Sequence, residues 1–320
     1  MSIKFSIGIP AYKAMFLDEC ITSIINQTYT NFELIIVNDA SPEDLDTIVS
    51  KYNDDRIKYY KNEKNFGAEN VIENWNKCLS YASGEYFILM GDDDKLCLNY
   101  LKEFDELIEK NPGFNVYHCR SLIIDENSNV STLTQSWPAH ESVIENMWHR
   151  INGWRTQFIS DFVYKTSFLC DNHGFYKNKL AWASDDITAY IAMKGKGVIH
   201  TNNALLNYRR SRINITSSGS VELKLNAVKN EFRWYREFLE SYKANTNNDF
   251  YLSMTIKNNL SKYEKKKRIE TIAYSGFFNG KGFLTNLLYW SIRFKKLDIS
   301  FSEYMYTIIM AIKKMKANIK

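Results

Sequence analysis

The sequence has few cysteines and no long apolar stretch, and each absence narrows what the protein can be. Its five cysteines include no Cys-x-x-Cys pair; they are Cys20, Cys78, Cys97, Cys119 and Cys170. An odd, unpatterned set predicts reduced thiols in a cytoplasmic protein. The longest apolar candidate, Tyr304 to Ile312, is about half of the roughly 18–20 residues that span a bilayer. The first residues also lack the long apolar segment of a signal peptide.

The net charge is small but unevenly distributed. The 320 residues are 45% hydrophobic, which allows one large domain or a core domain with an appendage. Residues 221–320 hold 19 Lys and Arg against 9 Asp and Glu, a net of +10, and residues 1–220 hold 22 against 28, a net of −6, which together give +4. The basic part suits an anionic surface such as phospholipid or nucleic acid.

Apolar runs alternate with segments of helical periodicity in the first half of the chain. The apolar runs predict strands over residues 5–9, 32–37, 57–60, 86–90 and 114–124. The helical spacing predicts helices over residues 16–26, 43–51, 68–81 and 99–110. This alternation predicts an α/β fold with a Rossmann-like, mainly parallel, doubly wound sheet.

The rest of the chain predicts a second part of this domain and a helical extension. Residues 131–160 contain no regular pattern, residues 181–195 a helical one, and 198–199 and 205–208 two short extended pieces. From about residue 221 the pattern is that of long, basic, amphipathic helices. We therefore expect a domain over residues 1–218, divided into 1–125 and 126–218, and a helical C-terminal region over 219–320, separated by the Ser/Thr/Gly stretch 216–220.

Three consecutive carboxylates, Asp92, Asp93 and Asp94, follow the apolar run at 86–90. Like charges in a row repel each other, at a cost of a few kcal/mol if they are desolvated. Such a cluster persists most easily when water or a hard divalent cation neutralises it; a solvated acidic turn is the alternative. Ligands of parallel sheets bind beyond the carboxyl ends of the strands. Pro10 and Asp39 follow two other strands, so all three segments converge on one edge.

The motifs at these strand ends resemble those of family 2 glycosyltransferases with the GT-A fold. The matching segments are 7–12, 23–29, 32–41, Asn65-Phe66-Gly67, Asn74-Trp75-Asn76 and 84–94. The resemblance covers residues 4–125 strongly and 180–215 more weakly, and it implies that 1–125 bind a nucleotide sugar and 126–218 form the acceptor side.

The resemblance implies that the loop after the first strand and the Asp after the second contact the nucleotide base. These positions hold Pro10, Ala11, Tyr12 and Asp39. A carboxylate can accept the imide N–H of uracil, so a UDP-sugar is the favoured donor, and Tyr12 can cover a face of the base. Asn65, Gly67 and Asn76 would form the floor of the pocket. The alternatives are a helix cap for Asp39, surface packing for Tyr12, and ordinary loop and helix positions for the other three.

The aspartates correspond to the Asp-x-Asp motif of the family, although Gly91 stands where many members have the first Asp. The resemblance implies that Asp93 binds Mn²⁺ or Mg²⁺ directly and that Asp92 bonds the ribose or a metal-bound water. Asp94 is either a second ligand or a structural cap. The metal would bridge the diphosphate and stabilise the departing nucleoside diphosphate.

A second acidic motif, Trp182-Ala183-Ser184-Asp185-Asp186, resembles the one that supplies the general base in inverting members. Asp185 is the first choice for the base and Asp186 the second; both could instead be helix N-terminal acids. Trp182 would stack on an acceptor sugar or pack in the core. Arg209 and Arg210 resemble the flexible basic segment that closes over the donor, where Arg suits diphosphate oxygens; a solvated charge run is the alternative.

These features predict a metal-dependent, inverting hexosyl- or N-acetylhexosaminyltransferase acting on a hydroxyl of a glycan or lipid-linked glycan. Surface polysaccharide biosynthesis, such as that of capsule or O-antigen, is the expected context. The protein would be cytoplasmic and could lie on the cytosolic face of the inner membrane. The segments 290–296 and 306–316 pair apolar residues with Lys and Arg, as interfacial helices do. They could instead pack on the catalytic domain or on a second copy of the chain in a homo-oligomer.

Two other functions compete with this one. A nucleotidyltransferase also uses metal-binding aspartates on a parallel sheet, but no Gly-rich phosphate loop follows the first strand. A non-catalytic protein could bind a membrane or nucleic acid through the basic C-terminal part. The acidic residues 1–220 and the absence of a recognisable binding motif argue against nucleic acid.

Overall fold

The computed structural model describes residues 5–211, 219–276, 283–294 and 299–317. The chain forms two compact units. The first, called here the sheet unit, comprises residues 1–177 and 183–214, and the second, the helical unit, comprises 178–182 and 215–320. The division falls close to the predicted boundary, but it assigns the short segment 178–182 to the helical unit.

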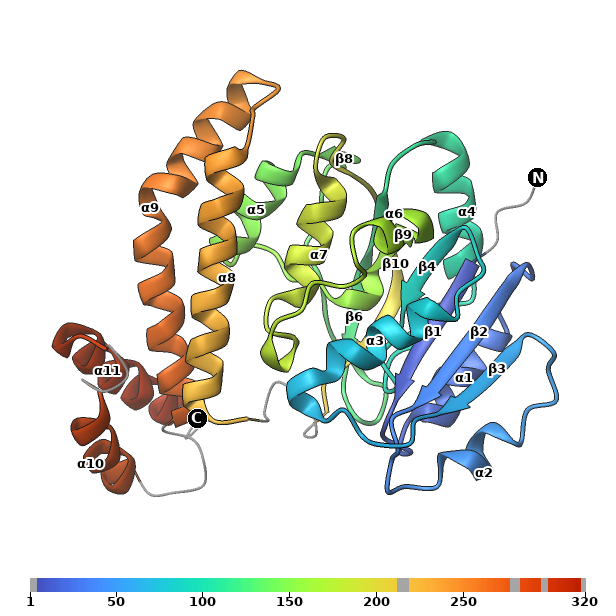
Figure 1. The fold of residues 1–320 in the computed structure, drawn as a ribbon, viewed down its shortest axis with the longest axis horizontal. Coiled ribbons are helices and arrows are strands. Elements are labelled where there is room, and N and C mark those ends of the chain that lie inside the picture. The colour runs from blue at the N-terminus through green and yellow to red at the C-terminus, as the bar shows by residue number, and fades with distance from the viewer. Residues whose placement is uncertain (1–4, 212–218, 277–282, 295–298, 318–320) are drawn as a thin grey trace. The chain divides into compact units, whose positions relative to one another are not determined.

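The sheet unit contains one mixed sheet with the strand order β3-β2-β1-β4-β9-β6-β10-β5 (Figure 1). Its parallel half consists of β1 (Phe5–Ala11), β2 (Phe32–Asn38), β3 (Ile57–Lys61) and β4 (Tyr86–Leu89). β9 (Phe162–Lys165) runs antiparallel to both β4 and β6 (Val116–Ile124), and β10 (Val198–Arg209) runs parallel to β6. The predicted α/β fold is confirmed.

Short strands complete the second half of the sheet. β5 (Lys95–Leu96) and β8 (His140–Glu141) pair antiparallel with β10, and β7 (Val130–Leu133) pairs with β6. The two extended pieces predicted at 198–199 and 205–208 are one strand, β10, whose register with β6 is interrupted between Thr201 and Leu206. That irregularity breaks the alternation of side chains, which is why the sequence pattern shows two pieces.

Helices cover the sheet. Those expected from periodicity are α1 (Leu17–Ile25), α2 (Leu45–Val49), the 3₁₀ turn η1 (Ala68–Asn70) with α3 (Val71–Ser80), α4 (Tyr100–Lys110) and α7 (Ser184–Met193). The prediction of no regular structure over 131–160 was wrong, because this segment holds β8, α5 (Val143–Ile151) and part of the 3₁₀ turn η2 (Ile159–Asp161). A capping box between Ser142 and Glu145 starts α5 and was the missed sequence signal. α6 (Thr166–Asp171) follows β9.

The core of the sheet unit explains its sequence pattern. β1, β2 and β4 are buried on both faces, so they form continuous apolar runs instead of alternating ones. α1 packs its apolar face, including Leu17, Ile21 and Ile24, against this core. The strands end abruptly in polar residues because their carboxyl ends leave the core at one edge.

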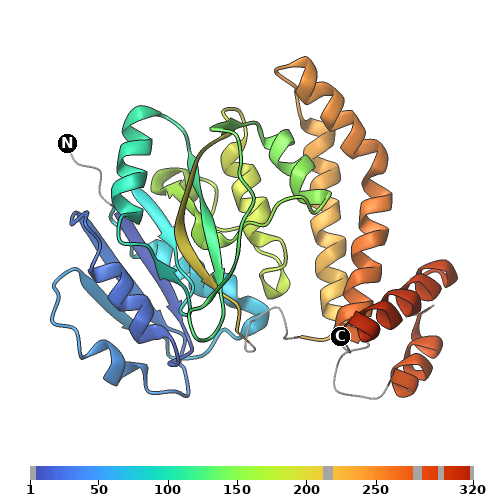
Figure 2. The same ribbon diagram turned by 180° about the vertical axis from the view of Figure 1, so that it is seen from behind.

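Within the part of the chain that the structure describes, the helical unit contains the 3₁₀ turn η3 (Lys179–Ala181) and four α-helices. α8 (Val221–Ser241) and α9 (Asn247–Thr271) lie side by side, and Figure 2 shows the same pair from behind. α9 continues into the π-helical turn η5 (Ile272–Gly276), and α10 (Phe283–Arg293) and α11 (Phe301–Ala317) follow. Trp290, Ile299 and Tyr304 belong to a small core of this unit. Among the described residues, no helix has both the length and the apolarity needed to cross a bilayer.

Candidate functional site

Three strand ends of the sheet unit are joined at one edge by direct hydrogen bonds. Ala11, at the end of β1, pairs with Asn38 of β2, and its carbonyl accepts from the backbone N–H of Asp39 (2.9 Å). The Asp92 carboxylate, beyond β4, accepts from the backbone N–H groups of Tyr12 (2.9 Å) and Lys13 (2.8 Å). The structure therefore brings Pro10, Ala11 and Tyr12 together with Asp39 and the aspartate triplet.

Asp39 is buried and does not cap a helix. Its carboxylate accepts from Nδ2 of Asn62 (2.8 Å) and from the backbone N–H of Phe66 (3.1 Å), whereas α2 is capped by Asp44. These contacts hold the loop that carries Asn65 and Gly67 beside Asp39. The sequence pattern gave no indication of Asn62, which anchors the carboxylate from the end of β3.

The remaining predicted base-contact residues differ in their surroundings. Tyr12 is 40% exposed, so its ring is available at the edge. Gly67 has a φ of +73°, a conformation that favours glycine, and its N–H donates to the Asn65 side chain. Asn76 turns elsewhere, because its Oδ1 accepts from the backbone N–H of Phe175 (2.8 Å). Asn65 and Gly67 therefore lie on the loop beside Asp39, where their part in the pocket stays a prediction, and Asn76 holds the turn before Phe175.

The three aspartates of the triplet have different partners. Asp92 is held by the backbone N–H groups of the loop after β1. Asp94 is held by the backbone N–H of Arg209 (2.9 Å) and by Oγ of Ser160 (3.3 Å). The Asp93 carboxylate instead contacts two side chains, Nζ of Lys13 (2.6 Å) and Oγ of Ser211 (3.5 Å). Asp93 is thus the carboxylate that long or rotatable side chains, rather than backbone, hold in place.

Lys13 neutralises part of the triplet. Its Nζ lies 2.6 Å from Asp93 and 3.2 Å from Asp92, and although burial alone would lower its pKa, the charges of these two carboxylates raise it. Burial raises the pKa of Asp92, and burial together with the charge of Asp93 raises the pKa of Asp94 well above its usual range. The repulsion expected from the sequence is therefore relieved by the ammonium of Lys13 and by backbone N–H donors.

A divalent cation fits this arrangement through Asp93. Within the described ranges, no three His, Cys, Asp or Glu side chains are placed to share one ion, so a protein-only cage is not present there. Mg²⁺ and Mn²⁺ need only one or two carboxylates when a diphosphate supplies further oxygens. Asp93 fits that role, and Lys13 Nζ can move away from it because Lys side chains are flexible. Asp94 fits the structural alternative, since its carboxylate is turned toward Arg209 and Ser160.

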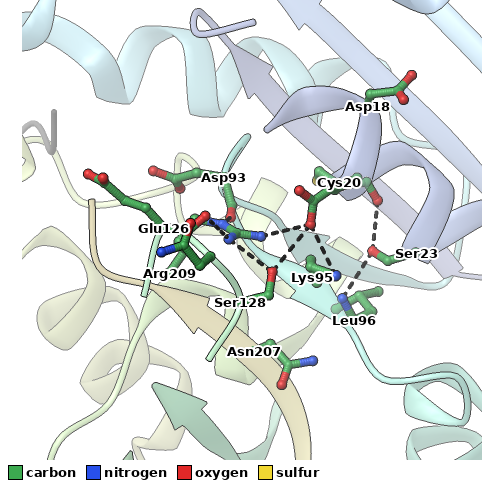
Figure 3. A network of polar contacts seen from close by, with 12 residues as sticks. Asp18, Cys20, Ser23, Asp93, Lys95, Leu96, Glu126, Ser128, Asn207 and Arg209 are labelled. Carbon is green, nitrogen blue, oxygen red and sulfur yellow. Dashed lines mark hydrogen bonds and ion pairs between the residues drawn. The ribbon is translucent and has the colours of Figure 1, made fainter. Parts of the chain in front are cut away.

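Arg209 lies against the aspartate triplet, and its side chain is enclosed by the protein. Its side chain is fully buried, its Nε donates to the Asp93 carbonyl (2.8 Å) and its Nη2 to Glu19 (3.0 Å), and its guanidinium stacks on Phe16. Figure 3 shows this network, in which Ser128 and Lys95 also reach the Glu19 carboxylate. The predicted diphosphate contact does not match this geometry, because every face of the guanidinium is occupied by the protein.

Arg210 has the opposite surroundings. Its backbone N–H donates to the Ile124 carbonyl (2.9 Å), and the residue is exposed. The donor contact therefore stays a prediction for Arg210. The residues that follow Ser211 in the predicted basic segment, including Arg212, lie outside the described residues.

The second acidic motif opens helix α7, and its two aspartates also differ. The Asp186 carboxylate is buried against Arg150, with Nε at 3.0 Å and Nη2 at 2.8 Å, and Gln157 donates a third hydrogen bond (2.7 Å). Burial would lower the pKa of Arg150, but the charge of Asp186 and the hydrogen bonds to it raise it. Asp185 is only partly buried. Asp186 is therefore a paired, anchored carboxylate, and Asp185 is the better candidate for a base.

The backbone before α7 is strained, and Trp182 lies within it. Leu180, Ala181 and Ala183 have φ values of +59°, +51° and +54°, which non-glycine residues adopt at a cost that is often retained at functional sites. Trp182 belongs to the helical unit, where Nζ of Lys267 lies 5.7 Å from its ring centroid. Its stacking on an acceptor sugar stays a prediction.

One segment that the sequence patterns missed reaches both acidic motifs. Gln157 bonds Asp186, while Oγ of Ser160 donates to Asp94 and accepts from the backbone N–H of Gly91 (3.3 Å). The Tyr100 hydroxyl fixes the Ser160 carbonyl (3.0 Å). The segment 157–160, together with Arg150, therefore ties the acids after β4 to those of α7.

Comparison with known proteins identifies the family of this chain. The model of the family described as glycosyl transferase family 2 matches residues 6–180 of the 320, more than half of the chain. A Campylobacter jejuni protein named GalNAc(5)-diNAcBac-PP-undecaprenol beta-1,3-glucosyltransferase is 28% identical over 247 residues, which are 75% of this chain and 73% of that protein.

Two solved structures share the fold. Staphylococcus aureus TarS, residues 1–349 in complex with UDP-GlcNAc, matches with a TM-score of 0.64 at 16% identity, over 98% of this chain and 92% of that one. The mannosyltransferase PcManGT of Pyrobaculum calidifontis, in complex with GDP-Man and Mn²⁺, matches with a TM-score of 0.56 at 14% identity, over 98% and 88%. The chain belongs to glycosyltransferase family 2 and is a glycosyltransferase with the GT-A fold.

Proposed function

We propose that the protein transfers a sugar, with inversion, from a UDP-sugar to a hydroxyl of a lipid-linked glycan during surface polysaccharide biosynthesis. The observation that carries this proposal is the division within each acidic motif. After β4, backbone N–H groups and Ser160 hold Asp92 and Asp94, whereas side chains contact Asp93. On α7, Arg150 and Gln157 hold the buried Asp186, whereas Asp185 is only partly buried.

The UDP preference rests on the base end of the site. Asp39 is held at the strand edge with an exposed tyrosine, Tyr12, on the neighbouring loop. A carboxylate accepts a hydrogen bond from the imide N–H of uracil. The TarS complex with UDP-GlcNAc shows a structure of this fold with a uridine nucleotide.

In the proposed reaction the acceptor oxygen attacks the anomeric carbon as the bond from that carbon to the UDP oxygen breaks. Asp185 accepts the proton of the acceptor hydroxyl, and the electron pair of the broken bond stays with UDP. A divalent ion held by Asp93 would supply positive charge to the diphosphate. Lys13 lies at the same place, 2.6 Å from Asp93, so its ammonium can turn to the diphosphate when a cation takes the carboxylate.

The acceptor class is inferred from the C. jejuni relative, whose name gives an undecaprenol diphosphate-linked acceptor. The site is consistent with such an acceptor, because a carboxylate base serves any sugar hydroxyl. An acceptor of this kind is embedded in a bilayer, so the enzyme needs access to a membrane surface.

The helical unit exposes apolar side chains on α10 and α11 that suit contact with a membrane. Leu284 (77% exposed), Leu288 (65%) and Ile292 (73%) form a stripe at helical spacing along α10, while Trp290 on the same helix is buried in the unit's core. α11 adds a second exposed apolar set: Phe301, Met305, Tyr306, Ile309 and Ile312. We propose that these faces, the apolar stripes, enter the interface of an anionic bilayer.

Charge favours a membrane over a second copy of the chain as the occupant. Arg293 and Lys313 are exposed at the ends of these stripes, and residues 221–320 have a net charge of +10 (19 − 9). Apolar side chains flanked by cations bind anionic headgroups, with each cation near the surface contributing about 1 kcal/mol, whereas two copies of a basic surface repel each other.

Calorimetry tests the donor proposal. UDP, dTDP, GDP and CMP are each titrated into the unaltered protein with and without Mn²⁺. The same titrations are then repeated with the Asp93→Ala variant. We expect Mn²⁺-dependent binding of UDP that is lost in the variant. Absence of binding by every nucleotide would overturn the donor proposal, and unchanged binding in Asp93→Ala would overturn the metal assignment.

Sedimentation with vesicles tests the membrane proposal. The triple variant Leu288→Ser, Ile292→Ser, Ile309→Ser should lose binding to phosphatidylglycerol-containing vesicles. Tyr251→Ser on α9, where the side chain is 68% exposed, is the matched control and should bind as the original does. An unchanged bound fraction in the triple variant would overturn the proposal. Light scattering that shows a dimer of the unaltered protein and a monomer of the triple variant would also overturn it.

A further inference from the structure

We propose that the aromatic pair Phe158–Tyr208 is the platform on which the acceptor's terminal sugar ring lies. The two rings are stacked, with centroids 3.5 Å apart and planes at 6°. The inference rests on the proposed function and deepens it, because it names the part of the enzyme that recognises a pyranose.

The pair has an inner and an outer member. Tyr208 packs against the hydrophobic core of the sheet unit, whereas Phe158 is outside that core and only partly buried. Among the described residues, Tyr208 is the aromatic ring that Phe158 contacts. The second face of Phe158 therefore has no aromatic partner within the described part of the chain.

The chain neighbours of the pair connect it to both acidic motifs. Phe158 lies between Gln157, which bonds Asp186, and Ser160, which bonds Asp94. Tyr208 precedes Arg209, whose backbone N–H bonds Asp94. A ring lying on this pair would be adjacent to the acids of the donor side and to those of α7, and that is where an acceptor sugar has to lie.

The electrostatic surroundings of Tyr208 agree with this position. Burial raises the pKa of its phenol, and the charges of Asp94, Asp93 and Asp185 raise it further, while Arg210 lowers it. Both carboxylates proposed to act, Asp93 and Asp185, are thus near enough to influence this one side chain.

The platform is also held rigidly, as a binding surface requires. The backbone N–H of Phe158 donates to the buried Asp161 carboxylate (2.7 Å), which Ser121 also contacts. The fixed backbone and the stacked partner restrict the Phe158 ring. An aromatic face presents apolar area to the axial C–H groups of a pyranose.

Steady-state kinetics test the platform. Phe158→Leu and Tyr208→Leu remove an aromatic face with little change in volume, and Tyr208→Phe keeps the face. The assay uses a UDP-sugar panel and N-acetylglucosamine linked through diphosphate to a polyprenol. We expect the KM for the acceptor to rise about tenfold in both Leu variants, to change less than about twofold in Tyr208→Phe, and the UDP affinity to stay the same in all three.

A matched control separates this role from a loss of packing. Tyr60 and Tyr81 form another stacked pair in the sheet unit, with centroids 3.8 Å apart and planes at 5°. Tyr81→Leu should lower the melting temperature as Phe158→Leu does, without raising the KM for the acceptor. Equal acceptor KM values in Phe158→Leu and the unaltered enzyme overturn the platform, as does a rise confined to the KM for the donor.

If no transfer is detected, that result counts against the proposed function alone. The platform is then tested by a measurement of sugar binding. Saturation-transfer NMR is recorded with the methyl glycosides of glucose, galactose and their N-acetylamino derivatives. At least one glycoside should give a saturation-transfer signal with the unaltered protein and no signal with Phe158→Leu. Signals that are absent with every glycoside, or that persist in Phe158→Leu, overturn the platform.

Discussion

In the two acidic motifs of the sheet unit, different partners reduce the repulsion between neighbouring carboxylates. After β4, the triplet is stabilised by backbone N–H groups, Ser160 and the ammonium of Lys13. On α7, the pair is stabilised by the guanidinium of Arg150 and the amide of Gln157. In the triplet, Asp93 differs from its neighbours because side chains contact it, and on α7 the paired Asp186 is buried whereas Asp185 is only partly buried.

The difference between the partners matches the difference in proposed tasks. A carboxylate that exchanges Lys13 for a cation must have a partner that can leave, and a Lys side chain is long and flexible. A base must keep its position relative to the acceptor, and a bidentate Arg pair on its neighbour fixes the first turn of α7. The comparison therefore predicts that anchored and acting carboxylates respond differently to substitution.

The largest effect is expected at Asp185. Asp185→Asn should lower kcat by about 10³-fold, because general base catalysis contributes 10²–10⁴-fold. The UDP affinity measured by calorimetry should not change, since the carboxylate does not hold the donor. A variant that keeps its transfer rate would assign the base to another residue.

The next effect is on stability, at the anchor of α7. Arg150→Met leaves the Asp186 carboxylate buried with Gln157 alone, and should lower the unfolding free energy in urea by about 3–5 kcal/mol. Lys51→Met is the control, because Lys51 pairs with Asp18 at an exposed position where ion pairs contribute little. Equal losses in the two variants would contradict the anchoring role of Arg150.

A smaller effect is expected at Asp93. Asp93→Asn should weaken UDP binding in Mn²⁺ by about 10²-fold and leave the affinity in EDTA as it is in the unaltered protein. Asp94→Asn should instead lower the melting temperature, because Asp94 is held by Arg209 and Ser160. If the two variants exchange these phenotypes, the assignment of roles within the triplet is wrong.

The smallest effect is expected at Ser160. Ser160→Ala removes one donor to Asp94 and one acceptor of the Gly91 N–H, both at 3.3 Å, and such a hydroxyl contributes about 1 kcal/mol. Thermal unfolding should show a decrease of this order, and Ser160→Thr, which keeps the hydroxyl, should show less. A decrease that is the same in both variants would mean that packing, and not the hydroxyl, matters here.

The parallel half of the fold could be read from the sequence because its signals are local. β1, β2 and β4 are largely apolar runs at whose ends Pro10, Asp39 and Asp92 lie, and the helices between them have regular apolar spacing. The second half could not be read in the same way. β10 is interrupted by a register shift, and α5 is short, so its capping box at Ser142 and Glu145 was the one clear signal.

The site residues, too, could be predicted only where the signal was local in the sequence. Asp39, Asp93 and Asp185 were singled out because motifs carry them, and their roles stay predictions. Asn62, Arg150, Gln157 and Ser160 were not found, because each acts on an aspartate distant in the chain. Arg209 was assigned to the donor because its segment resembles the flexible basic segment of the family, and the sequence does not show that its side chain is buried.

The sequence by itself determined the α/β class, the family resemblance and the strand ends at which the acids collect, since apolar periodicity and short motifs are properties of neighbouring residues. Only the tertiary structure decided which partners each aspartate has, such as Lys13 for Asp93, Ser160 for Asp94 and Arg150 for Asp186. Partners such as Lys13, Ser160 and Arg150 come from elements 36 to 80 positions away along the chain. Their charges and hydrogen bonds act through space, and the sequence does not record that proximity.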